Sequence, residues 1–169
     1  MSSIRPWILA ARPKTLFATL APIIVGISLS YKISNTIDWC LTFLIILSAV
    51  LLQIGSNYAN DAYDYLKGAD SQSRKGPKRM VQDGVLSANT VLNVMYIIFT
   101  LSVLIGYFLV KIGGWPIIVI GLSSIIFAII YTGGPYPLAY NGLGEITVFI
   151  FFGIIATVGT VYLQIVNSG

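Results

Sequence analysis

Long apolar stretches separated by short polar ones dominate the pattern along the chain. The hydrocarbon core of a bilayer is about 30 Å thick, and an α-helix crosses it with roughly 20 apolar residues. Five segments approach or meet this length, and we predict membrane-spanning helices at residues 15–31, 39–60, 89–110, 115–131 and 146–166. Because lipid offers no hydrogen-bond partner to the backbone, even the Val- and Ile-rich runs favour helices over strands. The pattern therefore predicts an all-α, polytopic transmembrane helix bundle in which residues 1–169 form a single domain.

The composition excludes several other classes of protein. Hydrophobic residues make up 56% of the chain and charged residues only 9%, whereas a soluble domain carries about 25% charged residues. Cys40 is the single cysteine, so a disulfide-rich scaffold is excluded. A nucleic-acid-binding function is also excluded, because segments that lie in lipid leave no room for an extended basic surface. The composition indicates an integral membrane protein in contact with the lipid bilayer.

The positions of the basic residues predict how the spans are oriented. Cytoplasmic loops of membrane proteins collect lysine and arginine. With five spans, eight basic residues fall on one side of the membrane, and only Lys32 and Lys111 fall on the other. We therefore expect a multi-pass protein of the cell's inner (cytoplasmic) membrane. Its N-terminus and the loops at residues 61–88 and 132–145 are expected in the cytoplasm.

A polar stripe marks the end of the second predicted span. Its members are spaced so that they share one face of a helix; they are Gln53, Asn57, Asn60, Asp61 and Asp64. A carboxylate near hydrocarbon costs a few kcal/mol on insertion scales, so such a stripe should face a protein interior or a wet cavity. The stripe is therefore a candidate functional site.

The residues of the stripe, with the charged residues that follow it, are typical of a site for a metal-bound polyphosphate. Mg²⁺ takes oxygen ligands, commonly one or two carboxylates, and shares its remaining coordination with water and substrate phosphates. The predicted metal ligands are Asn57, Asn60, Asp61, Asp64 and Asp70. Basic side chains neutralise phosphate charge, and the predicted phosphate-binding residues are Arg74, Lys75, Lys78 and Arg79.

Two simpler interpretations remain open from the residues alone. Asp61 and Asp64 can lie in water where a span ends, and the preference for positive charge on the cytoplasmic side places basic residues here without any ligand. The close succession of an acidic stripe, the helix terminator Gly68, a further acid at Asp70 and a basic cluster favours the polyphosphate site.

These motifs resemble those of the UbiA-type intramembrane aromatic prenyltransferases. The first aspartate-rich motif of that family has the form Asn-Asp-x-x-Asp with a further Asp, and here it reads NDAYD at residues 60–64 and GAD at residues 68–70. Three further stretches resemble the branch of the family that prenylates 1,4-dihydroxy-2-naphthoate in menaquinone synthesis. They are WILAARPKT at 7–15, RKGPKRMVQDG at 74–84, and YTGGPYPL at 131–138 with GLGE at 142–145.

The resemblance implies a fold of nine helices and a second aspartate-rich motif that helps to bind Mg²⁺ and diphosphate. This chain has five predicted spans, and Glu145 is the only acidic residue after Asp83. The sequence is thus expected to be the N-terminal part of a longer enzyme, a split half whose missing helices come from a second polypeptide, or a decayed copy.

The resemblance also implies a reaction, in which a polyprenyl diphosphate prenylates 1,4-dihydroxy-2-naphthoate with loss of carbon dioxide and gives demethylmenaquinone. Asp61, Asp64 and Asn60 would be catalytic, with Mg²⁺ as cofactor. The implied contacts to the aromatic substrate are Lys14, Tyr131, Tyr136 and Glu145. The alternatives are another aromatic acceptor, such as 4-hydroxybenzoate, and a non-catalytic membrane subunit that binds a cation.

Overall fold

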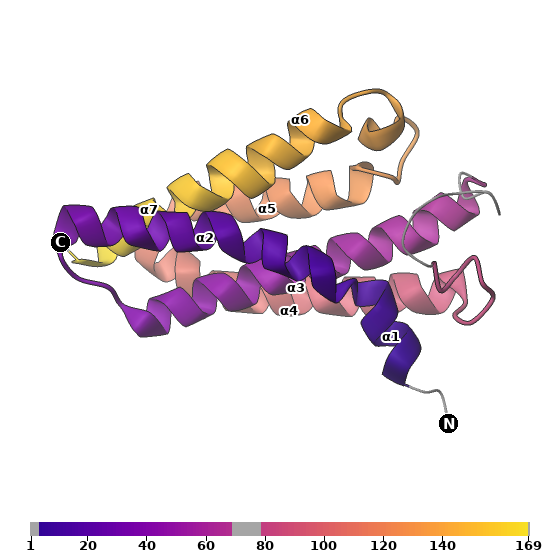
Figure 1. Cartoon of the computed structure of the whole chain (residues 1–169), viewed down its shortest axis with the longest axis horizontal. Helices are drawn as coiled ribbons and strands as arrows, with labels where there is room; N and C mark the ends of the chain where they lie inside the picture. The colour runs from indigo at the N-terminus through magenta and orange to yellow at the C-terminus, as the bar shows by residue number, and fades with distance from the viewer. Residues whose placement is uncertain (1–3, 69–78, 169) are drawn as a thin grey trace.

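The described part of the chain consists of helices joined by turns and loops. The computed structural model describes residues 4–68 and 79–168, and the longer helices in it run along one common axis (Figure 1). Its elements are α1 (Ile4–Ala11), α2 (Pro13–Ser34), α3 (Trp39–Leu66), α4 (Ala88–Gly113), α5 (Trp115–Ile130), the 3₁₀ turn η1 (Leu138–Tyr140), α6 (Gly144–Val148), the π-helical segment η2 (Phe149–Ile155) and α7 (Ala156–Ser168). The predicted all-α class is confirmed.

Four of the five predicted spans are confirmed as long apolar helices within the described residues. They are α2, α3, α4 and the continuous stretch Gly144–Ser168 that joins α6, η2 and α7. The remaining predicted span forms α5, which has 16 residues and is about 24 Å long at 1.5 Å per residue. α5 is therefore shorter than an average hydrocarbon core, because the chain leaves the helix after Ile130 and turns at Gly134 (φ 72°).

Most helices extend one to three residues beyond the predicted spans, and two larger differences stand out. α1 was not predicted, and it precedes α2 at an angle, with Arg12 (φ 52°) in the left-handed region between them (Figure 1). The second span was expected to end at residue 60, but α3 continues to Leu66. Protein covers the carboxylates of Asp61 and Asp64, so the helix does not need to end where charge begins.

Local signals explain where the helices begin and turn. The carboxylate of Asp38 caps α3 by accepting a hydrogen bond from the backbone N–H of Leu41 at 2.8 Å. Ser87 caps α4 in the same way through the N–H of Thr90 at 3.2 Å. Gly114, at φ 66°, lets the chain reverse directly from α4 into α5.

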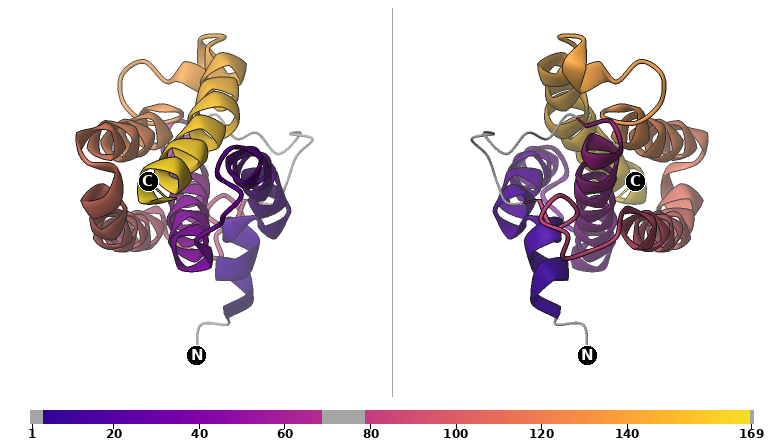
Figure 2. Two further views of the ribbon diagram at one scale, coloured as in Figure 1. Left: turned by 90° about the vertical axis from the view of Figure 1, so that its left-hand side faces the viewer. Right: turned by 90° about the vertical axis from the view of Figure 1, so that its right-hand side faces the viewer.

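α3 lies in the middle of the bundle, with α2 on one side of it and α4 and α5 on the other (Figure 2). Its contact with α4 is close enough to require glycine. A Cβ atom added to Gly55 would stand 2.4 Å from the ring of Phe99. α2 and α7 approach in a similar way, because a Cβ on Gly26 would stand 2.7 Å from Cβ of Thr160. Small residues at such contacts are typical of helix packing in membranes.

The connecting segments gather at two opposite ends of the bundle. At the end that we call the acidic end, Thr132 bonds to Asn60 and the backbone of Met80 bonds to Asp61. At the other end, the backbone N–H of Asp38 donates to Gln164 Oε1 at 3.1 Å. The start of α2 and the segments at 79–87 and 131–143 thus lie together at the acidic end, as the alternating topology predicts.

Candidate active site

The polar stripe predicted on the second span is buried in the structure. All five of its members lie on the last four turns of α3, and each is among the buried residues of that helix. Asp61 is only 1% exposed and Asp64 only 3%. The interpretation in which these carboxylates are solvated at a span end is therefore wrong. Burying two carboxylates is costly unless they are paired or hydrogen-bonded, so their partners define the site.

The segment that begins with Arg79, the last residue of the basic cluster, folds back over α3 and supplies two of these partners. Arg79, itself buried at 6% exposure, forms an ion pair with Asp64. The next residue, Met80, donates its backbone N–H to Oδ2 of Asp61 at 3.2 Å. Met80 and Val81 are also part of the apolar cluster at this end of the bundle, which anchors the returning chain. Of the four predicted phosphate-binding residues, Arg79 lies within the described part of the chain, and it is placed beside the carboxylates.

The loop between α5 and α6 supplies further partners from the opposite side. We call residues 131–143 the capping segment. Within it, the hydroxyl of Thr132 donates to Asn60 Oδ1 at 2.9 Å, and the hydroxyl of Tyr140 donates to Asp64 Oδ1. Nζ of Lys67, at the end of α3, donates to the carbonyl of Gly134.

The first two residues of the stripe, Gln53 and Asn57, face the junction of α1 and α2. The amide nitrogen of Asn57 donates to the carbonyl of Ala11 at 2.8 Å and to the hydroxyl of Thr15 at 2.9 Å. Its oxygen accepts a bond from Gln53 at 3.3 Å, and Gln53 in turn accepts one from Thr19. Asn57 therefore ties α3 to the junction of α1 and α2, and its role as a metal ligand stays a prediction.

The donor atoms at the acidic end fit a hard cation such as Mg²⁺. Oδ1 of Asp61 is buried and has no hydrogen-bond partner among the described residues, so a carboxylate oxygen is available there. Asn60 adds an amide oxygen and Asp64 adds carboxylate oxygens on adjacent turns. Among the described residues, no group of three or more His, Cys, Asp or Glu side chains is placed so that it could hold a metal ion. Such a sparse set suits Mg²⁺, which commonly takes one or two carboxylates and shares the rest of its coordination with water and phosphates.

The other predicted site residues lie in several places. Asp70, Arg74, Lys75 and Lys78 fall outside the described residues. Lys14, Tyr136 and Glu145 are exposed near the acidic end, at the start of α2, in the capping segment and in the first turn of α6. Tyr131 lies deeper, in the wall of a cavity that begins beside Asn60.

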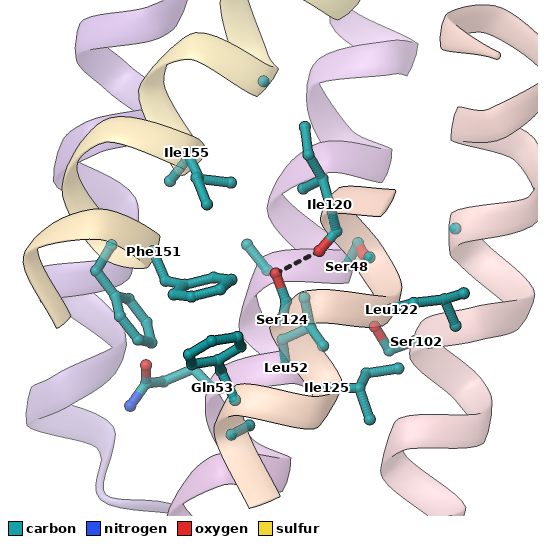
Figure 3. Close-up of a pocket in the computed structure, with 18 of the residues that line it drawn as sticks. Ser48, Leu52, Gln53, Ser102, Ile120, Leu122, Ser124, Ile125, Phe151 and Ile155 are labelled. Carbon is teal, nitrogen blue, oxygen red and sulfur yellow. Dashed lines mark hydrogen bonds between the residues drawn. The ribbon is translucent and has the colours of Figure 1, made fainter. Parts of the chain in front are cut away.

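This cavity, of about 530 Å³, lies between α2, α3, α4, α5 and the stretch Gly144–Ser168. Its α3 wall runs from Ile45 to Asn60, or about 22 Å along the helix at 1.5 Å per residue. Leu52, Ile125 and Phe151 are among the side chains that surround it (Figure 3).

Only uncharged side chains line the cavity within the described part of the chain. Two of the hydroxyl groups in its wall donate to the backbone of their own helices. That of Ser124 donates to the carbonyl of Ile120 at 2.7 Å (Figure 3), and that of Thr160 donates to the carbonyl of Ala156. The cavity is therefore suited to an apolar molecule whose polar end lies beside Asn60.

Two residues of the site were not predicted from the sequence, Thr132 and Tyr140. Both lie in or next to the motifs at 131–138 and 142–145 that carried the resemblance. The prediction instead selected the tyrosines at 131 and 136, and Tyr136 is exposed. Three glycines and two prolines in residues 131–143 indicate a tightly turned loop. The glycine and proline content does not predict which hydroxyl of the loop donates a hydrogen bond to α3.

Comparison with known proteins gives a consistent family assignment. The 1,4-dihydroxy-2-naphthoate octaprenyltransferase of Mycobacterium leprae is 37% identical over 164 residues, which cover 97% of this chain and 55% of the relative. The protein of the same name from Escherichia coli is 38% identical over 170 residues, again 97% of this chain and 55% of the relative. UbiA prenyltransferase domain-containing protein 1 of Dictyostelium discoideum is 28% identical over 158 residues, or 90% and 48%.

The chain thus spans about half the length of the curated relatives it matches. No solved structure matches it. The model of the UbiA prenyltransferase family matches residues 19–168, which include α3 with its buried carboxylates and the capping segment. The chain therefore belongs to the UbiA prenyltransferase family.

Proposed function

We propose that the protein is a Mg²⁺-dependent membrane prenyltransferase, which transfers a polyprenyl group from polyprenyl diphosphate to 1,4-dihydroxy-2-naphthoate with loss of carbon dioxide. The product is the prenylated quinol, recovered after oxidation as demethylmenaquinone. One observation carries the proposal. Two buried carboxylates and the buried guanidinium of Arg79 meet at the end of the bundle where a long apolar cavity begins. The names of the relatives from M. leprae and E. coli support the choice of acceptor.

The arrangement assigns separate tasks to the parts of the site. Asp61 and Asp64 would hold Mg²⁺ with help from Asn60, and Arg79 would bind the diphosphate. Mg²⁺ bound there supplies Lewis-acid stabilisation of the negative charge on the departing diphosphate. The apolar cavity would hold the isoprenoid chain and keep water away from the allylic carbon, so that the electron-rich naphthoate ring attacks it instead.

The ion pair between Arg79 and Asp64 is compatible with these tasks. Without an anionic ligand, a buried guanidinium needs a carboxylate partner, and Asp64 provides one. A diphosphate offers Arg79 a second anion, with which it can form bidentate hydrogen bonds. Sharing Arg79 with the diphosphate leaves oxygens of Asp64 available to a metal.

The proposed location is the inner membrane, with the acidic end toward the cytoplasm. Arg5, Arg12, Lys14 and Lys67 lie on the elements that meet at this end, whereas Lys32 and Lys111 lie in the last turns of α2 and α4, toward the opposite end. An excess of positive charge favours the cytoplasmic side. Water-soluble substrates would then reach the site from the cytoplasm.

The test is product formation in membranes from cells that produce the chain, alone or together with the C-terminal half of a full-length relative. The second preparation supplies the polypeptide that a split enzyme would require. Each is incubated with Mg²⁺, octaprenyl diphosphate and either 1,4-dihydroxy-2-naphthoate or 4-hydroxybenzoate, and products are identified by mass spectrometry. We expect demethylmenaquinone in at least one preparation, lost on addition of EDTA.

Two results would contradict the proposal. If 4-hydroxybenzoate is prenylated and 1,4-dihydroxy-2-naphthoate is not, the proposed acceptor is wrong. No product in either preparation would favour a non-catalytic subunit that binds a cation.

A further inference from the structure

We propose that Thr132 and Tyr140 are positioning residues, which reach α3 from the capping segment and fix the orientation of Asn60 and Asp64 for metal binding. This inference rests on the proposed function, because it concerns the same site. It assigns to the capping segment a task in the assembly of the metal site, separate from any contact with the aromatic substrate.

The contacts between the two segments follow one face of α3. The capping segment reaches Asn60 through Thr132, Asp64 through Tyr140 and Lys67 through the carbonyl of Gly134. Asn60, Asp64 and the C-cap residue Lys67 are spaced by four and by three positions, so they follow one face at the end of α3.

The capping segment is also packed directly against α3. A Cβ atom on Gly133 would stand 3.0 Å from the ring of Tyr63, on the same face as Asn60 and Lys67, and 2.6 Å from the carbonyl of Ile129. The loop therefore lies against the last turns of α3 with no space for a side chain at Gly133.

Internal hydrogen bonds hold the capping segment in one shape, which lets it deliver its hydroxyls at defined positions. The N–H of Ala139 donates to the carbonyl of Tyr131 at 2.9 Å, and the N–H of Leu143 donates to that of Leu138 at 3.1 Å. The side-chain amide of Asn141 donates to the carbonyl of Pro137 at 2.7 Å. The loop that carries Tyr140 therefore has a defined fold, which places the hydroxyl of Tyr140 beside Asp64.

Both oxygens of Asp64 are engaged, and partners among the described residues come from two different segments. Tyr140 bonds to Oδ1 and Arg79 bonds to Oδ2, so the plane of the carboxylate is fixed from two sides. Hydrogen bonds to a ligating carboxylate set its orientation, and loss of such a partner typically costs about 10- to 100-fold in metal affinity or activity. The hydroxyl of Tyr140 is in a position to have this effect on Asp64, and that of Thr132 on Asn60.

Because Tyr140 is partly exposed, a variant can separate the effect of its hydroxyl from the effect of its packing. The residue is 47% exposed, so replacing it by phenylalanine leaves its packing almost unchanged and removes only the hydroxyl. Thr132 is buried, so its hydroxyl is tested by a pair of variants. Thr132→Ser keeps the donor, and Thr132→Val keeps the shape.

The experiment measures Mn²⁺ binding by electron paramagnetic resonance, with inorganic diphosphate present, in the purified preparation that forms product. We expect Tyr140→Phe and Thr132→Val each to weaken Mn²⁺ binding about tenfold or more, while Thr132→Ser binds as the wild type does. Matched controls are Tyr65→Phe, an exposed tyrosine of α3, and Thr100→Val, an exposed threonine of α4. Both controls should bind Mn²⁺ normally, and the thermal unfolding midpoint of every variant is recorded.

The outcomes separate the two proposals. If the wild type forms product and binds Mn²⁺, but Tyr140→Phe and Thr132→Val bind it equally well, the positioning roles are wrong and the proposed function stands. Weaker binding that Thr132→Ser shares with Thr132→Val would also contradict a role for the hydroxyl. If the wild type neither binds Mn²⁺ nor forms product, the proposed function fails, and the positioning roles fail with it.

Discussion

Asp64 and Arg79 form a buried ion pair, and this makes each residue dependent on the other. Their burial follows from the returning segment at 79–87, which packs Met80 and Val81 against α3. Removing one partner of a buried pair leaves an uncompensated charge and typically costs about 3–5 kcal/mol. The pair therefore has a structural effect that must be separated from its proposed role in catalysis.

We predict that Arg79→Gln lowers the free energy of unfolding by about 3–5 kcal/mol, because it removes the buried cation that is paired with Asp64. The double variant Asp64→Asn with Arg79→Gln should recover part of this loss, since it removes both charges. Denaturant titration in detergent measures both values. Equal stability of the Arg79→Gln variant and the wild type would show that the pair is not formed in the folded protein.

A second carboxylate, at the opposite end of the bundle, predicts a pH effect. Asp38 accepts hydrogen bonds from the N–H of Leu41 and from Asn167, and chiefly the bond from Leu41 lowers the pKa of its carboxyl below 3.8. A lowered pKa in the folded state means stabilisation that is present above the ordinary pKa and is lost as pH falls through the folded value.

We therefore expect the stability difference between the wild type and Asp38→Ala to shrink as pH falls below about 4. At pH 7 the variant should be less stable by about 1 kcal/mol, the typical value of an N-cap. Unfolding midpoints in detergent from pH 3 to pH 7 measure the difference. A difference that does not change with pH would contradict the cap.

At the scale of helices, close packing of α3 on α4 depends on Gly55. Alanine at an exposed helix position stabilises by about 1 kcal/mol relative to glycine, but a Cβ at Gly55 would collide with Phe99 at 2.4 Å. We predict that Gly55→Ala lowers the free energy of unfolding by about 1–3 kcal/mol, as overpacking does.

Gly106, on α4, is the matched control, because a Cβ there would meet no atom within 4 Å. Gly106→Ala should be neutral or stabilising in the same denaturant titration. If the two variants behaved alike, α3 and α4 would not be in the close contact that the structure has.

The helices and their polar stripe were largely predictable from the sequence, because both follow from periodicity and apolar length. Three features were not. The burial of the last turns of α3 by residues 79–87 depends on contacts that span 15 and 19 positions of the sequence. The break between α1 and α2 and the turn that follows the early end of α5 at Ile130 depend on local backbone geometry at Arg12 and Gly134. In each case tertiary contacts or backbone conformation, which local pattern does not contain, decided the result.

The same limit applies to the candidate site. The carboxylates of Asp61 and Asp64 were predictable because their spacing on a helix is fixed. The hydroxyls of Thr132 and Tyr140 were not, because their contacts with α3 span 72 and 76 positions of the sequence. Only the folded loop places the hydroxyl of Tyr140, and not that of Tyr136, against Asp64.

At the scale of the whole molecule, the orientation in the membrane is a testable prediction. Cys40 is the single cysteine, so Cys40→Ser provides a background without thiols. In that background, Thr36→Cys places a thiol at the end opposite the acidic end, and Asp83→Cys places one near the acidic end, both at exposed positions. A membrane-impermeant maleimide should label residue 36 in cells whose outer barrier has been opened, and residue 83 only after the inner membrane is also opened. The reverse pattern would place the acidic end outside the cytoplasm.

The central claim is that the buried carboxylates at the acidic end carry the catalytic effect. It is tested most directly by the initial rate of demethylmenaquinone formation in membranes that contain Asp61→Asn, Asp64→Asn or the control Asp83→Asn, whose side chain is exposed. Stabilisation of the leaving group by a bound metal is worth several kcal/mol, and each 1.36 kcal/mol is a factor of ten in rate. We therefore predict a fall of about 100-fold or more for Asp61→Asn and Asp64→Asn, and an unchanged rate for Asp83→Asn. Rates of Asp61→Asn and Asp64→Asn equal to that of the control, at equal amounts of folded protein, would contradict the claim.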